Sequence, residues 1–170
     1  MAKSHKAYAF DWWSFEIDLR PLPEAGLIAN DPAELEALID DTRQAFTDPS
    51  EGEPLSVGWQ SALENRDVHE YGDYALTRFC DVNDDSGIQE AWAEVSERLP
   101  TAAANTLLGF LIGPPERLFD PGRYGSYFQT PDRARDSLEI LEPLSVPESV
   151  RFDELLERCV VQRRGVYVTF

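Results

Sequence analysis

The sequence contains no apolar stretch long enough to cross a membrane. Its longest uninterrupted apolar run, LLGFLI at residues 107–112, falls far short of the roughly 18 residues that a membrane-spanning helix needs. The first ten residues hold two lysines but neither an apolar core nor a small-residue cleavage site, so we expect no secretory signal. Together these absences predict a cytoplasmic protein.

Cysteine is scarce, and the common catalytic signatures are missing. Cys80 and Cys159 lie far apart without metal-ligand spacing, so we expect two free thiols that pack as small apolar side chains. The sequence holds no GxGxxG, GxxxxGK[ST], GxSxG, CxxC or HExxH pattern. We therefore predict no cofactor and no catalytic residue, and a non-enzymatic protein is favoured.

Positive charge is also in short supply. The chain carries 15 basic and 32 acidic residues, for a net charge of −17. Most of the excess lies in residues 1–100, with 22 acidic and 7 basic side chains, whereas residues 101–170 carry 10 and 8. This charge repels nucleic-acid phosphates and anionic membranes and attracts a basic protein, peptide or polyamine. Solubility or a saline habitat could also account for it.

The length and composition indicate a single globular domain that spans residues 1–170, with 1–6 expected to be mobile. At 42% hydrophobic residues, the chain can bury a core without a disulfide or a metal. Aromatic and alternating patterns predict strands at 7–13 and 166–170, which could pair in one small sheet. Between them, about five helices are expected. Their ranges are 30–46, 84–100, 101–115, 130–144 and 152–165. The fold class is therefore α+β.

Three other segments lack a clear helix or strand pattern. Residues 18–26 (DLRPLPEAG) are expected to bend away from regular structure because they hold two prolines and a glycine. Residues 47–54 are expected to form an exposed acidic loop. Residues 70–82 suit either a helix or a strand, and helix is favoured.

Two groups of residues have a partial resemblance to metal sites. Asp81, Asn83 and Asp85 stand at the first three ligand positions of a calcium loop, but the required glycine and the final glutamate are missing. His69 and Asp73 share a helical spacing of four, which could hold a divalent ion, yet no third ligand is evident. We predict no metal site. A surface histidine with a pKa raised by acidic neighbours is the favoured interpretation of His69.

Residues 119–131 (FDPGRYGSYFQTP) form the least ordinary stretch of the chain. They predict a type II turn at 120–123, a second bend at Gly125, a short strand at 126–129 and a helix that begins at Thr130. Arginine and amphipathic aromatic side chains suit a carboxylate or phosphate ligand, and they are also common at protein interfaces. The candidate ligand-binding residues are Arg117, Arg123, Tyr124, Tyr127 and Gln129.

The leading functional hypothesis is a non-enzymatic acidic protein that binds a basic macromolecular partner. A bacterial immunity or inhibitor protein that masks a cationic toxin surface would have this profile, with electrostatic steering and exposed aromatic anchors. The candidate partner-binding residues are Trp59, Asp40, Asp41, Glu51 and Glu53.

Two alternatives remain open. The first is a small-molecule sensor or enzyme with a site around Arg117–Gln129, to which His69 could contribute; it predicts a pocket that Arg123 and Tyr127 enter, near a titratable group with a shifted pKa. The second is a homo-oligomer whose contacts are formed by the apolar strands near the two ends of the chain.

Overall fold

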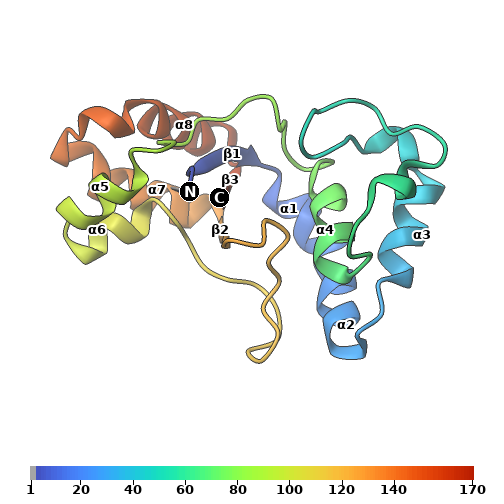
Figure 1. Ribbon diagram of the computed structural model, residues 1–170. Coiled ribbons are helices and arrows are strands. Elements are labelled where there is room, and N and C mark those ends of the chain that lie inside the picture. Colours follow the sequence, from blue (N-terminus) through green and yellow to red (C-terminus); the bar gives the residue numbers. More distant parts are fainter. Residues whose placement is uncertain (1–2) are drawn as a thin grey trace.

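The strands nearest to the two ends of the chain lie side by side in one sheet (Figure 1). The computed structural model describes residues 3–170. The sheet is antiparallel and has the strand order β1-β3-β2, with β1 at Lys6–Phe10, β2 at Ser126–Gln129 and β3 at Gly165–Thr169. The predicted pairing of the terminal strands is therefore confirmed, and the last strand is the central one.

Helices cover both faces of this sheet. The described residues form eight α-helices, rather than the five or so predicted, and the α+β class is confirmed. Their bounds are α1 Trp12–Ser14, α2 Pro21–Ala29, α3 Ala33–Asp41, α4 Val68–Leu76, α5 Trp92–Arg98, α6 Thr101–Thr106, α7 Pro131–Leu141 and α8 Val150–Gln162. In Figure 1, α1–α4 lie on one side of the sheet and α5–α8 on the other.

The alternation of side chains along the strands separates two hydrophobic cores. Tyr8, Phe10 and Tyr167 belong to the core on the side of α1–α4. Ala7 and Val168, which alternate with them, belong to the core on the side of α5–α8. The sheet therefore separates the two cores, and each helical layer buries its apolar side chains against one face of the sheet.

Two predictions for the N-terminal part are wrong. The strand predicted for 7–13 ends at Phe10, because the Asp11 side chain accepts a hydrogen bond from the Ser14 backbone and starts α1. Residues 18–26 are helical, in a π-helix (Phe15–Leu19) followed by α2. The prolines of α2 stand in its first turn, where a missing backbone N–H removes no helical hydrogen bond.

Two further elements end earlier than predicted. The helix expected over 101–115 ends at Thr106, because the Phe110 backbone exchanges two hydrogen bonds of 2.9 Å with Phe128. The last helix ends at Gln162, its C-cap Arg163 adopts the left-handed conformation, and Gly165 already belongs to β3. The Gln129 carbonyl approaches Gly165 so closely that a Cβ atom would not fit.

Two other predictions agree with the structure, whereas the helix predicted for 84–100 is limited to α5, which begins at Trp92. Residues 70–82 contain most of α4, as favoured, and Thr130 caps α7 through a hydrogen bond from the Arg133 backbone. Of the segment expected to be mobile, residues 1–2 lie outside the described residues, His5 is buried and Lys6 begins β1. Among residues 3–170, no helix combines the length and apolarity that a bilayer crossing requires.

Candidate functional site

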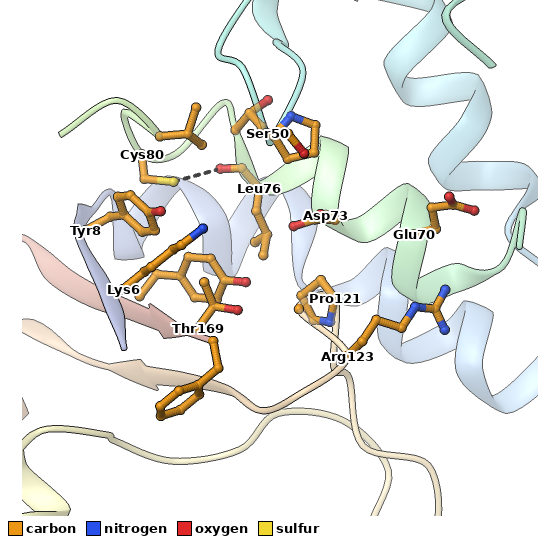
Figure 2. Close-up of a pocket in the computed structure, with 16 residues that line it drawn as sticks. Lys6, Tyr8, Ser50, Glu70, Asp73, Leu76, Cys80, Pro121, Arg123 and Thr169 are labelled. Atoms are coloured by element: carbon orange, nitrogen blue, oxygen red, sulfur yellow. Dashed lines mark hydrogen bonds between the residues drawn. The ribbon is translucent and has the colours of Figure 1, made fainter. Parts of the chain in front are cut away.

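A pocket of about 360 Å³ lies where the sheet meets α4 and the turn at residues 120–123 (Figure 2). Strands β1 and β3 form one wall, α4 forms another, and the turn and residues 49–50 complete it. Most of its lining is polar. The polar side chains are Lys6, Tyr8, Ser50, Glu70, Asp73, Thr77, Cys80, Arg123, Tyr167 and Thr169.

Asp73 of α4 supplies a carboxyl group directed into this pocket (Figure 2). Within residues 3–170 it makes neither a hydrogen bond nor a salt bridge. Burial raises the pKa of the Asp73 carboxyl to about 7, and repulsion from Asp48 adds to this, whereas Lys6 and Arg123 act in the opposite direction. Asp73 can therefore gain or lose a proton near neutral pH.

Two hydroxyl-bearing residues of β3 line the same pocket. Tyr167 and Thr169 are alternate residues of the central strand, so their side chains lie on one face of the sheet. Neither buried hydroxyl has a hydrogen-bond partner in the described chain. Burial holds the pKa of Tyr167 well above its usual value, with a further contribution from Asp73, although the Thr169 and Ser126 hydroxyls act in the opposite direction as close neighbours whose contacts do not meet hydrogen-bond geometry.

Several other polar groups of the pocket already have partners. The Glu70 carboxylate accepts hydrogen bonds from the backbone N–H groups of residues 64–66, at 2.6 to 2.8 Å. Arg123 forms a salt bridge of 2.8 Å with Asp67. The Cys80 thiol donates to the Leu76 carbonyl at 3.5 Å, and burial raises its pKa to about 12. These groups therefore shape the pocket rather than offer free hydrogen-bonding capacity.

The five predicted ligand-binding residues do not converge on one site. Arg123 lines the pocket, whereas the neighbouring Tyr124 is 66% exposed. Arg117 donates to the Leu27 carbonyl at 3.2 Å and lines a separate cavity of about 290 Å³. Tyr127 packs on the other side of the sheet, in contact with Phe170.

The burial and hydrogen bonds of Gln129 indicate a structural role for this residue. Its side chain is fully buried, and its amide N–H group donates to the carbonyls of Thr106 and Leu108 at 2.8 and 3.3 Å. The Ser137 hydroxyl donates to its amide oxygen at 2.7 Å. These bonds join β2 to α7 and to the segment after α6.

The turn at residues 120–123 differs from the predicted type II turn. The Arg123 N–H donates to the Asp120 carbonyl at 3.1 Å, but positive φ angles occur at Arg123 and Gly125 rather than at Gly122. Gly122 has a steric role instead, because a Cβ atom there would collide with Oγ1 of Thr169. The absence of a side chain at Gly122 thus lets the turn approach the pocket wall.

The proposed pair of His69 and Asp73 is divided between two cavities, with His69 beside Arg117 and Asp73 in the polar pocket. Nδ1 of His69 accepts a hydrogen bond of 3.0 Å from the Asp120 backbone. The predicted upward shift of its pKa is wrong, because burial lowers the pKa despite the opposing effect of Asp67. No group of three or more possible metal-ligating side chains occurs within the described range.

The carboxylates of the calcium-like segment accept hydrogen bonds from the backbone. Oδ1 of Asp85 accepts hydrogen bonds from the backbone N–H groups of Ala7 and Gly87, at 3.0 and 2.8 Å. Asp81 accepts one from the Asn83 backbone at 2.9 Å. These carboxylates organise the loop and hold it against β1.

The predicted partner-binding residues fall into two groups. Trp59 is only 5% exposed, and its indole N–H donates to Asp40 at 2.9 Å, so neither side chain is a free surface anchor. Asp41, Glu51 and Glu53 are exposed and form no salt bridge with residues 3–170. The buried Trp59 ring packs against Tyr71 and Tyr74 instead.

Sequence reasoning missed most of the pocket. Tyr167 and Thr169 were predicted only as strand residues, Lys6 only as part of the mobile segment 1–6, and Asp73 was considered only with His69. One signal was present in VYVTF at residues 166–170, where hydroxyl-bearing residues alternate with valine. That pattern places two hydroxyls on one face of a strand whose other face is apolar.

Comparisons with known proteins identify no relative. No family model matches this chain, and neither the curated proteins nor the solved structures gave a match. The functional assignment therefore rests on the residues of the pocket and of the surface.

Proposed function

We propose that this protein binds a small polar molecule in the pocket between the sheet and α4. The observation that carries the proposal is the set of polar groups left without partners at one place. Oγ1 of Thr169 and the Tyr167 hydroxyl are buried and unpaired, and the Asp73 carboxyl shares their pocket. Both hydroxyl oxygens are closed to solvent, so a ligand with several hydrogen-bonding groups would supply the missing partners by displacing the side chains that cover them.

The rest of the molecule supports this interpretation. Tyr167 and Thr169 carry the only fully buried side-chain oxygen or nitrogen atoms without a hydrogen bond among residues 3–170. Elsewhere, buried polar side chains such as Gln129 have complete sets of partners. An unsatisfied buried group costs about 1–3 kcal/mol, so two in one pocket favour a site that a ligand completes.

The proposal corresponds to the small-molecule alternative from the sequence, with a different set of residues. Arg123 contributes to the pocket, and Asp73 is the expected titratable group with a shifted pKa. Tyr127 and Gln129, which were predicted to bind the ligand, lie outside the pocket, and Tyr167 and Thr169 of the central strand line it instead. The volume of about 360 Å³ lies at the lower end of the range for small-molecule sites.

A screen of small polar metabolites by ligand-observed NMR at neutral pH would test this proposal. We expect Tyr167→Phe and Thr169→Val each to weaken binding of a hit by about tenfold, because each removes one hydroxyl that the ligand would pair with. Tyr124→Phe is the matched control, since that hydroxyl is exposed outside the pocket. Unchanged binding in both pocket variants would refute the assignment.

The surface of α3 and the following loops supports a second candidate function, the binding of a basic macromolecule by a cytoplasmic immunity or inhibitor protein. A group of acidic side chains there has no salt bridge within the described chain, namely Asp31, Glu34, Glu36, Asp40, Asp41, Glu51, Glu53 and Glu64. Val57, which is 83% exposed, lies in the same region and offers an apolar contact.

Binding of a lysine-rich decapeptide would test this second candidate. Replacement of Asp41, Glu51 and Glu53 by their amides should weaken binding and reduce its salt dependence, because unpaired carboxylates attract a cationic partner over long range. The same replacement of Glu139, Glu154 and Glu157 is the control for net charge. An affinity that does not change between low and moderate salt would exclude electrostatic recognition.

A further inference from the structure

We propose that the ligand of this pocket is a small zwitterion of the amino-acid class, with its ammonium group at Asp73 and its anionic group at Lys6. This inference rests on the proposed function and adds the chemical class of the ligand. It follows from the charges of the pocket and from their separation.

Four charged side chains line the pocket, and two of them are free. Glu70 is occupied by three backbone N–H groups, and Arg123 is paired with Asp67. Lys6 and Asp73 have no salt bridge with any described residue. Both are labelled in Figure 2, where they extend toward the interior of the pocket from β1 and α4. One free cation and one free carboxyl group, which ionises near neutral pH, therefore share the cavity.

The fold keeps these two charges apart. Lys6 interacts electrostatically with Asp73, yet their nitrogen and oxygen atoms are not within the 4.0 Å of a salt bridge. Lys6 is fixed on the edge strand β1, opposite Thr169 of β3, whereas Asp73 belongs to a helix on the far wall. A molecule with complementary charges at its two ends would fit between them.

The unpaired hydroxyls extend this complementarity. Thr169 is the cross-strand neighbour of Lys6, so its hydroxyl can donate a hydrogen bond to the anionic end of the ligand. The Tyr167 hydroxyl lies close enough to Asp73 for the carboxylate to raise its pKa, and its oxygen can accept a hydrogen bond from the ammonium end. Each end of the ligand thus meets one charge, and it gains one hydroxyl once the side chains that cover the two closed hydroxyl oxygens move aside.

Ligands of other classes fit less well. A simple anion would approach Lys6 against the repulsion of Asp73, Asp48 and a protein of net charge −17. A simple cation would leave Lys6 unpaired, and a neutral polyol would leave both charges unpaired. Only a ligand that carries both signs of charge uses every free group of the pocket.

The experiment compares zwitterions of graded length with analogues that carry one charge or none, by NMR titration of the intact protein. The zwitterions are glycine, β-alanine, γ-aminobutyrate and lysine; butyrate and butylamine are the singly charged analogues of γ-aminobutyrate, and glucose and glycerol are the neutral probes. We expect at least one zwitterion to bind about tenfold more tightly than either singly charged analogue, because it gains an attraction at each end.

Variants assign the two ends of the ligand. Lys6→Met should weaken zwitterion binding by about tenfold and leave butylamine binding unchanged, whereas Asp73→Asn should weaken it similarly and leave butyrate binding unchanged. Lys3→Met and Asp41→Asn are the matched controls, because these residues lie outside the pocket.

The outcomes separate this inference from the proposed function. If glucose or glycerol binds in a manner sensitive to Tyr167→Phe and no zwitterion binds, the site is a small-molecule site and the zwitterion class is wrong. If no compound in the panel or in the metabolite screen binds, both are wrong. Equal binding of the zwitterions and their singly charged analogues, or equal losses in the pocket and control variants, also overturns the inference.

Discussion

Nδ1 of His69 accepts a hydrogen bond of 3.0 Å from the backbone N–H of Asp120, and this contact fastens one wall of the pocket to α4. The ring of Phe119, the preceding residue, stacks on the His69 ring, and the salt bridge between Asp67 and Arg123 lies just beyond the turn. The turn that closes the polar pocket is therefore fastened to α4 and to Asp67, the N-cap residue of that helix, in addition to its contacts with Ser126 of β2.

Acidification should weaken this attachment. Burial lowers the pKa of His69 in the folded protein, with Arg123 acting in the same direction and Asp67 and Asp120 opposing it. As the pH falls below about 6.5, the unfolded chain binds a proton that the folded chain resists, so stability decreases until the folded pKa is reached. We expect a loss of about 1 kcal/mol in urea unfolding from this histidine.

Two substitutions at His69 separate the hydrogen bond from the charge. His69→Asn can keep an acceptor near the position of Nδ1 and should flatten part of the acid dependence, whereas His69→Leu should lose about 1 kcal/mol at neutral pH. His5 is also buried with a lowered pKa, so some dependence should remain in both variants. An acid dependence that is identical in His69→Asn and the wild type would contradict this role.

Asp73→Asn should stabilise the ligand-free protein at neutral and alkaline pH. The folded pKa of about 7 lies above the unfolded value of about 3.9, so stability falls as pH rises between the two values, because the unfolded chain ionises first. An amide removes this cost, and we expect a gain of about 2 kcal/mol above pH 7 and little change near pH 4. Thermal unfolding across this range measures the effect, and Asp41→Asn should show no such trend.

Gly72→Ala should destabilise the protein although alanine is the better helix former. A Cβ atom at this position of α4 would collide with the Phe119 ring. The gain in helix propensity is about 1 kcal/mol, and overpacking costs about 1–3 kcal/mol, so the net loss should be about 1 kcal/mol. In a double-mutant cycle, Phe119→Leu should relieve much of the loss; simple additivity would show that the ring does not cause it.

Gln129→Leu should cost about 3 kcal/mol in denaturant unfolding, because it leaves the Thr106 carbonyl and the Ser137 hydroxyl without their partners in a buried site. Tyr124→Ala, five residues earlier, should have an effect within about 0.5 kcal/mol, because that ring is exposed. Similar losses in the two variants would rule out a structural role specific to Gln129.

The local patterns of the sequence were sufficient for the α+β class and for most of the elements. Thr130 caps α7 as expected, and the alternating residues of 166–170 form nearly all of β3. The predictions failed where a local signal has two structural meanings. The prolines of residues 18–26 were taken for helix breakers, but they stand in the first turn of α2, where proline is tolerated.

The sequence by itself determined the excess of acidic charge, the apolar strands and the helix boundaries set by capping residues, because these depend on neighbours within a few positions. Only the tertiary structure decided the pocket. Lys6, Asp73 and Tyr167 lie far apart in the chain and meet because β3 pairs with β1 while α4 packs beside the sheet. The pKa of Asp73 and the unpaired hydroxyls follow from that burial, which no local pattern specifies.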